Sequence, residues 1–99
     1  PKIARTFAER IHFAHLRNVR KDPDGSFEEA PHLEGDTDLV AVIRELLEAE
    51  ASRGHSIPFR PDHGHELLSD SDRATLPGYT LIGRLRGLAE LRGVIAALA

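Results

Sequence analysis

Two short segments of the chain place histidine close to carboxylate or guanidinium side chains. The first runs from Ile11 to Arg17 and contains His12 and His15, and the second runs from Arg60 to His65. Neutral imidazole is the commonest metal ligand in proteins. A carboxylate is a hard ligand that suits manganese, iron or magnesium. The two segments therefore indicate a metal-dependent site.

His15 and Asp62 are the candidate ligands in these segments. His15 lies towards the end of a predicted strand, and Asp62 directly follows a second one. Successive side chains of an extended chain point in opposite directions, so His63 would point away from a metal bound by Asp62. His63 could then act as a general acid or base near neutral pH. The alternatives are a structural histidine and an Asp-His-Gly turn, and the residue types alone leave both interpretations open.

Three arginines and the single tyrosine are further candidates. Arg17, Arg60 and Arg84 could hold a carboxylate or a hydroxyl-rich substrate, because a guanidinium presents a fork of donors. Pairing with surface Asp and Glu is the alternative for each. Tyr79 follows a Pro-Gly pair, and its phenol could donate a proton or orient a leaving hydroxyl. Its alternative role is an aromatic anchor for the helix that follows.

The other histidines are less informative. By strand alternation His12 faces away from His15, so we expect it to be structural. His55 is expected in an exposed loop, and His32 and His65 stay open. The chain has no His-Glu-x-x-His motif, no phosphate-binding glycine loop and no dinucleotide fingerprint.

The composition excludes several classes of protein. The 99 residues carry a net charge of −3, with 13 basic and 16 acidic side chains and no basic run, so we expect no nucleic-acid partner. No apolar run approaches transmembrane length, so we expect no membrane partner either. The absence of Cys excludes a disulfide scaffold and cysteine-based zinc sites within these residues.

The pattern of apolar residues predicts an α/β fold made of two β/α units. The chain turns at residues 21–26, and an acidic loop containing His32 is expected over residues 27–34. A long polar loop follows the second strand, over residues 62–78. The expected elements are a strand over residues 10–19, a helix over 37–52, a strand over 57–61 and a helix over 79–97.

Both predicted helices carry local signals. Asp36 or Thr37 is the expected N-cap of the first helix, and Gly54 is its stop signal. The second helix has one broad apolar face, made of Leu81, Leu85, Leu88, Leu91, Ile95 and Leu98. Its glycines weaken the helix but allow close packing.

Five blocks of sequence resemble, in order, the C-terminal part of mannonate dehydratase. They are Ile11–Val19, His32–Asp36, Arg60–His65, Pro77–Tyr79 and Ile82–Gly93. The resemblance covers nearly the whole chain from about residue 10, and its specificity comes from the series of blocks. It implies a (β/α)8 TIM barrel of the xylose-isomerase-like group, of which this chain would hold the last two units. We therefore expect the chain to be a piece of a larger protein and incomplete as a barrel.

The resemblance also implies an activity, the removal of water from D-mannonate to give 2-keto-3-deoxy-D-gluconate with Mn²⁺ or Fe²⁺. His15 and Asp62 match metal ligands of the family, and His63 and Tyr79 match its proton-transfer residues. Which of His63 and Tyr79 is the acid and which the base stays open. The full-length protein is expected to be a cytoplasmic homo-oligomer of hexuronate catabolism.

Two alternatives remain, a sugar isomerase of the same barrel group and a non-catalytic α/β interaction module. The family's other metal ligands, a His and a Cys, would lie on earlier strands. Because two ligands alone hold a metal weakly, we expect this polypeptide by itself to be inactive.

Overall fold

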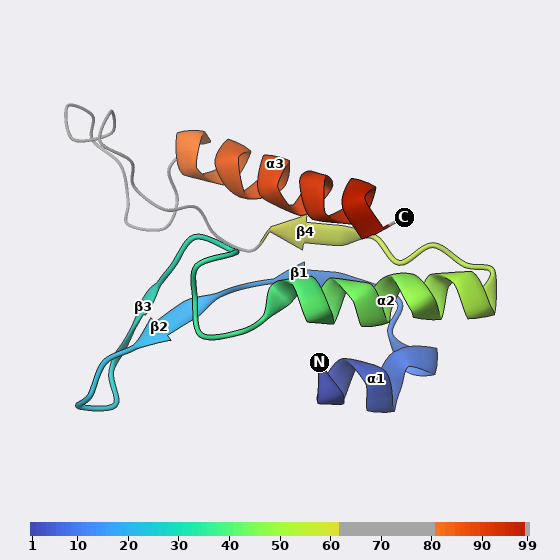
Figure 1. Ribbon diagram of the computed structural model, residues 1–99, viewed down its shortest axis with the longest axis horizontal. Helices are drawn as coiled ribbons and strands as arrows, with labels where there is room; N and C mark the ends of the chain where they lie inside the picture. The colour runs from blue at the N-terminus through green and yellow to red at the C-terminus, as the bar shows by residue number, and fades with distance from the viewer. Residues whose placement is uncertain (62–80, 99) are drawn as a thin grey trace.

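Two parallel strands that are far apart in the sequence lie side by side in this protein (Figure 1). The computed structural model describes residues 1–61 and 81–98. Parallel strands require a crossover connection, and a helix between the two strands supplies it. The elements are α1 (Lys2–Phe7), the 3-10 helix η1 (Ala8–Arg10), β1 (Ala14–Leu16), β2 (Val19–Lys21), β3 (Phe27–Glu29), α2 (Leu39–Arg53), β4 (Phe59–Pro61) and α3 (Leu81–Leu98).

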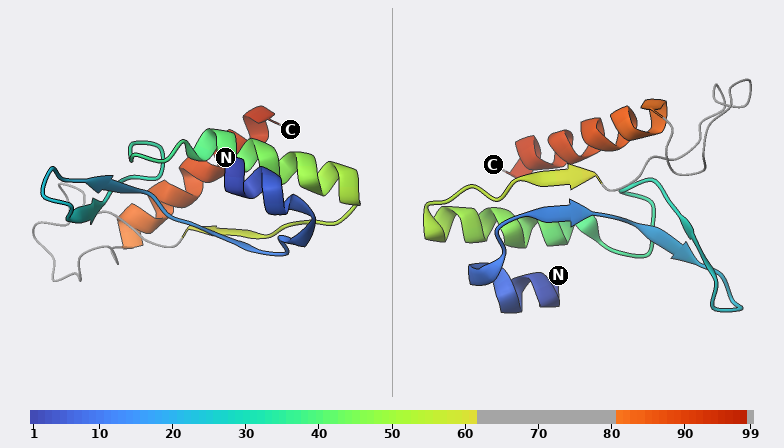
Figure 2. Two further views of the ribbon diagram at one scale, coloured as in Figure 1. Left: turned by 90° about the horizontal axis from the view of Figure 1, so that it is seen from below. Right: turned by 180° about the vertical axis from the view of Figure 1, so that it is seen from behind.

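The two faces of the β1–β4 sheet differ in their surroundings. Helices α2 and α3 lie on one side of the two strands (Figure 2, left). Leu16 is buried on that side, and Ala14 and Phe59 pack there against the core. His15 and Arg60, at alternate positions, are exposed on the other face. The structure is thus a mixed α/β arrangement whose small sheet is covered by helices on one face in the part described.

The core forms between α2, α3 and the two parallel strands. Ile43 of α2 is fully buried, and Leu91 of α3 is 2% exposed. Burial of such side chains contributes about 1.5–3 kcal/mol each relative to leaving them in water. The buried core residues are Leu16, Leu39, Ile43, Leu46, Ala49, Ile57 and Leu91.

The predicted helix over residues 37–52 corresponds to α2, but its N-cap differs from both predicted residues. Asp38 Oδ1 accepts from the backbone N–H of Ala41 at 3.0 Å. Asp36 is engaged elsewhere, because its Oδ2 accepts from the N–H of Lys21 at 2.7 Å. Gly54 ends the helix with a left-handed φ of 70°, as the sequence predicts.

The single strand predicted over residues 10–19 is divided in the structure. Residues 8–10 form η1, β1 pairs with β4, and β2 pairs antiparallel with β3. The break lies at Asn18, whose side-chain Oδ1 accepts from the N–H of Val19 at 3.0 Å. Such local side-chain bonds compete with a regular strand ladder, so the chain leaves the parallel sheet there.

The β2–β3 hairpin extends away from the helices (Figure 1). Its turn lies within residues 21–26, as predicted, with the N–H of Asp22 donating to the carbonyl of Ser26 at 2.8 Å. Gly25 has a φ of 91°, which favours glycine. The loop predicted over residues 27–34 is therefore partly strand, because residues 27–29 return along β2.

The predicted strand over residues 57–61 is shorter in the structure, where β4 begins at Phe59. Proline has no N–H to donate to a ladder, so Pro58 precedes the strand. Its carbonyl still accepts from the N–H of Ala14 at 3.0 Å.

The apolar face predicted for α3 is turned inwards in part, because Leu91 is buried and Ile95 and Leu98 pack against the core, whereas its first two leucines are exposed. Leu81 and Leu85 are 71% and 56% exposed. The buried positions are Gly83, Gly87 and Leu91, each four residues after the last. Glycine at these positions lets the helix backbone approach its neighbours closely. Of the predicted helix 79–97, residues 79 and 80 lie outside the described residues.

In residues 1–61 and 81–98, no helix combines the length and apolar character needed to cross a bilayer.

Candidate functional site

The exposed face of the β1–β4 sheet carries two of the predicted site residues, His15 and Arg60. His15 and Arg60 are register partners on the two parallel strands. Paired residues of a sheet place their side chains on the same face, so the two strands bring these side chains together. Arg17 follows His15 by two residues and is exposed as well.

The His15 ring has an aromatic neighbour on its own strand segment. The ring centroids of Phe13 and His15 are 4.8 Å apart at an interplanar angle of 67°. This edge-to-face contact limits the orientations of the imidazole. Phe13 is itself 50% exposed, so both rings lie on the open face of the sheet.

Arg17 is held by strand β3 rather than left free on the surface. Its Nη2 donates to Glu29 Oε1 at 2.9 Å. Its guanidinium carbon lies 5.9 Å from the ring centroid of Phe27, within the range of a cation–π contact. The hairpin therefore fixes the Arg17 side chain beside the end of β1.

Of the remaining predicted residues, the structure describes two arginines on β4 and α3, and three residues lie outside its described part. Arg60 is the middle residue of β4, and Arg84 is half-buried near the start of α3. The predicted residues Asp62, His63 and Tyr79 lie outside the described residues.

Asn18 is a buried residue that sequence reasoning did not select. It is 1% exposed, and its side-chain amide makes four hydrogen bonds. Its Nδ2 donates to the carbonyls of His32 at 2.7 Å and Thr37 at 2.8 Å. Its Oδ1 accepts from the N–H groups of Val19 and Thr37, each at 3.0 Å. The full capacity of an amide side chain is thus used, and the segment before α2 is tied to the end of β1.

His32, whose role the sequence leaves open, is buried behind β1. It is 2% exposed, and its Nε2 lies 2.9 Å from the carbonyl oxygen of Leu16. Since a carbonyl oxygen only accepts, Nε2 carries the proton of this bond. A β-carbon built on Gly87 of α3 would lie 2.7 Å from His32 Nδ1. The imidazole therefore lies between β1 and α3.

His12 is engaged within the fold, as expected of a structural residue, and His55 is exposed in a loop, as predicted. His12 Nδ1 lies 3.1 Å from Nη2 of Arg53. The same guanidinium donates through Nη1 to the carbonyls of Ala8 at 3.1 Å and Ile11 at 2.5 Å. His12 is thus engaged with α2, and His55 is exposed beyond the end of that helix.

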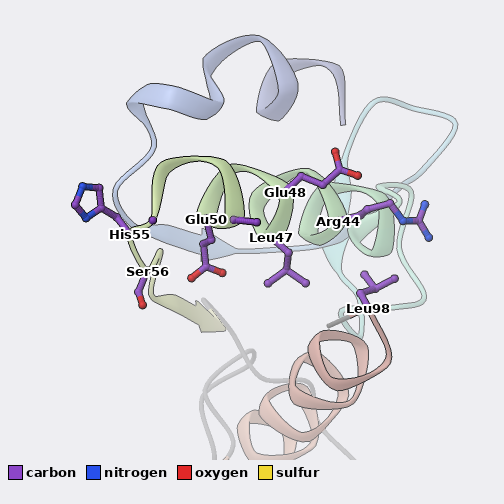
Figure 3. Close-up of a pocket in the computed structure, with 9 residues that line it drawn as sticks. Arg44, Leu47, Glu48, Glu50, His55, Ser56 and Leu98 are labelled. Carbon is purple, nitrogen blue, oxygen red and sulfur yellow. The ribbon is translucent and has the colours of Figure 1, made fainter.

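An open groove of about 710 Å³ lies between α2 and the end of α3 (Figure 3). Leu47 and Leu98 contribute apolar surface to it, and Arg44 and Glu50 contribute charge. Glu50 is already engaged, because its Oε2 accepts from the N–H of Ile57 at 2.9 Å. This groove lies at the helices, whereas His15 and Arg60 lie on the open face of the sheet.

The pKa shifts arise from ion pairs away from this face. The pKa of the Arg86 guanidinium is raised, chiefly by its bond to Glu90 at 2.9 Å and also by Glu34 at 2.7 Å. The pKa of Glu45 is lowered by its bond to Arg5. These pairs tie α3 to the segment before α2, and α1 to α2.

The described residues can supply part of a metal site. His15 is an exposed imidazole on the open face, and Asp62 is the residue that follows β4 in the sequence. Across residues 1–61 and 81–98, no three His, Asp or Glu side chains are grouped so that they could hold a metal ion. His15 is the one predicted metal ligand in that part of the chain.

Comparison with known proteins identifies the family. The sequence profile of D-mannonate dehydratase (UxuA) matches residues 1–99. The chain belongs to the D-mannonate dehydratase family. It is 55% identical over 101 residues to mannonate dehydratase of Brucella canis, covering 99% of this chain and 25% of that protein. It is 56% identical over 108 residues to the enzyme of Rhizobium meliloti, covering 100% of this chain and 27% of that protein.

The fold agrees with a solved structure of the same family. The crystal structure of mannonate dehydratase from Streptococcus suis serotype 2 superposes with a TM-score of 0.79 at 31% sequence identity. The match covers 98% of this chain and 27% of that one. The chain thus spans about a quarter of the length of the relatives it matches.

Proposed function

We propose that the full-length protein containing this chain is a metal-dependent mannonate dehydratase, and that this chain supplies one wall of its active site. The observation that carries the proposal is the shared register position of His15 and Arg60 on the exposed face of two parallel strands. Family membership over residues 1–99 supports it. In this proposal β1 and β4 are consecutive strands of a (β/α)8 barrel whose interior is the face that carries His15.

The proposed reaction removes one molecule of water from D-mannonate. The bond between carbon 2 and its hydrogen breaks, and its electron pair forms a double bond to carbon 3. The bond between carbon 3 and its hydroxyl oxygen breaks, and that hydroxyl leaves as water after it is protonated. The resulting enol tautomerises to the 2-keto-3-deoxy acid. One residue must accept the first proton, and another must donate the second.

The residues of this chain divide these tasks. His15 and Asp62 would hold a divalent ion, Mn²⁺ or Fe²⁺, together with ligands from the rest of the protein. When bound, that ion acts as a Lewis acid that stabilises negative charge on the substrate oxygens. His63 and Tyr79 are the proposed proton-transfer pair. Arg17, Arg60 and Arg84 are the proposed substrate-binding guanidiniums, and for Arg17 the bond to Glu29 holds the side chain in place.

The test uses the purified full-length protein with Mn²⁺ or Fe²⁺ and D-mannonate. We expect formation of the 2-keto-3-deoxy acid and exchange of the carbon 2 hydrogen with solvent deuterium. His63→Ala and Tyr79→Phe should each slow turnover, and the one that also slows exchange is the base. Turnover and exchange near wild type in both variants would contradict the assignment. A sugar isomerase, the alternative activity, would instead interconvert an aldose and a ketose in a substrate screen.

The 99-residue chain alone should be inactive, because it holds too few of the proposed ligands. Mannonate dehydration by the purified chain would contradict this expectation. Size-exclusion chromatography of the same sample should show dimers or larger species, because exposed strand edges favour association. A non-catalytic interaction module is instead favoured if the full-length protein has no lyase activity.

A further inference from the structure

A buried polar pair, Asn18 and His32, connects the end of β1 to the segment that precedes α2. Asn18 donates to the carbonyl of His32 at 2.7 Å, and His32 Nε2 donates to the carbonyl of Leu16 at 2.9 Å. Both side chains are at most 2% exposed. A buried donor that loses its partner costs about 1–3 kcal/mol, so the pair holds a defined backbone geometry.

The carbonyl that accepts the hydrogen bond from His32 belongs to Leu16, at the end of β1. Leu16, the last residue of β1, lies between His15 and Arg17, the two exposed residues that face the proposed site. In the part of the sheet described, β1 has three residues and β4 is its one neighbour. A strand this short has few ladder bonds, so the bond from His32 is a substantial part of what fixes its end.

Helix α3 packs against the His32 imidazole on the side opposite β1. Gly87 faces the ring so closely that a β-carbon would lie 2.7 Å from Nδ1 and 2.9 Å from Cε1. One residue earlier, Arg86 pairs with Glu34, two residues after His32 in the chain. The ring therefore cannot move away from β1 without moving α3.

We propose that His32 is a positioning residue for the active site. It fixes the backbone between His15 and Arg17, and thereby sets where the imidazole ligand and the guanidinium stand relative to β4. This role rests on the proposed function, because it requires His15 to bind the metal. Displacements of about 1 Å by changes remote from the chemistry can lower rates by roughly a hundredfold, so the role has a measurable consequence.

The experiment compares His32→Leu and His32→Gln in the full-length protein. The electron paramagnetic resonance signal of free Mn²⁺ gives the metal dissociation constant, and steady-state kinetics with D-mannonate give kcat and KM. His32→Leu should weaken Mn²⁺ binding by about tenfold, the lower end of the range for outer-shell partners of metal ligands. His32→Gln keeps an N–H donor for the Leu16 carbonyl and should recover most of the affinity.

A matched control separates this role from a loss of stability. Ile43→Val removes one methylene from the fully buried core of α2 and should leave Mn²⁺ affinity within twofold of wild type. If His32→Leu folds and binds Mn²⁺ as well as Ile43→Val does, the positioning role is wrong. It is equally wrong if His32→Gln is as impaired as His32→Leu.

A second pair of variants decides the matter if His32→Leu does not fold. Gly87→Ala places a methyl group against the His32 ring and should also weaken Mn²⁺ binding. Gly93→Ala lies on the same helix with nothing within 4 Å of the added carbon and should not. Equal affinities in these two variants would overturn the inference. A wild-type protein that neither binds Mn²⁺ nor dehydrates mannonate would overturn the proposed function itself.

Discussion

His15 of β1 and Arg60 of β4 occupy the same register position on two neighbouring parallel strands. Both are exposed on the sheet face that the helices leave open. A substrate carboxylate bound by a metal at His15 would therefore lie within reach of the Arg60 guanidinium. The register thus places a predicted metal ligand beside a predicted substrate-binding group.

Replacement of Arg60 should therefore affect substrate binding and not metal binding. Arg60→Ala in the full-length enzyme removes a charged donor worth about 2 kcal/mol, which corresponds to a rise of roughly thirtyfold in KM for D-mannonate. Mn²⁺ affinity should stay near wild type. Arg20→Ala, on the hairpin and paired with Glu28, is the control and should change neither. A loss of Mn²⁺ binding in Arg60→Ala would contradict this division of roles.

Metal titration should separate His15 from His12. His15→Ala in the full-length protein should lose Mn²⁺ affinity by at least about tenfold, because loss of a ligand costs no less than loss of an outer-shell partner. His12→Ala should retain it, since His12 Nδ1 is engaged by Arg53. If His12→Ala lost Mn²⁺ affinity and His15→Ala kept it, His12 would be the metal ligand and the assignment to His15 would be wrong.

The fold was predictable where local signals and burial agree. Local chemistry predicts the helix α2 with one buried apolar face, its end at Gly54 and the turn at Gly25. The structure has each of these features. The division of the first strand was not predicted, because Asn18 is held there by bonds to Thr37, nineteen residues away, as well as by the local bond from the Val19 N–H. The exposure of Leu81 and Leu85 was not predicted, because hydrophobicity favours turning leucine inwards, whereas Gly83 and Gly87 occupy the buried positions in that part of α3.

The candidate site was predictable in part for the same reason. Alternation alone places His15 and Arg17 on one face, and both are exposed in the structure. Strand alternation could not predict which side chains contact Arg17, because Glu29 and Phe27 reach it through a hairpin that the sequence did not predict. The buried role of His32 requires knowledge of the Leu16 carbonyl, and no spacing in the sequence indicates that contact.

The N-cap of α2 gives a direct test of local stability. Asp38→Ala removes the acceptor for the Ala41 N–H and should lower the free energy of unfolding by about 1 kcal/mol. Thr37→Ala is the matched control, because Thr37 is bonded to Asn18 through its backbone N–H and carbonyl. Urea unfolding monitored by circular dichroism measures both. A larger loss in Thr37→Ala would favour the cap that the sequence predicted.

Replacement of Arg53 should lower the stability of the fold more than replacement of Arg44, the other arginine of α2. Its guanidinium donates to the carbonyls of Ala8 and Ile11 and holds the chain that enters β1. Because hydrogen bonds from charged groups contribute about 1.5–3 kcal/mol each and are not additive, Arg53→Ala should lower the free energy of unfolding by about 2 kcal/mol. Arg44→Ala, an exposed position of the same helix, should change it by less than about 0.5 kcal/mol. Arg53→Lys cannot reach both carbonyls with a planar fork, so it should fall between the two. Equal unfolding midpoints for Arg53→Ala and Arg44→Ala would mean that these bonds do not hold the entrance to β1.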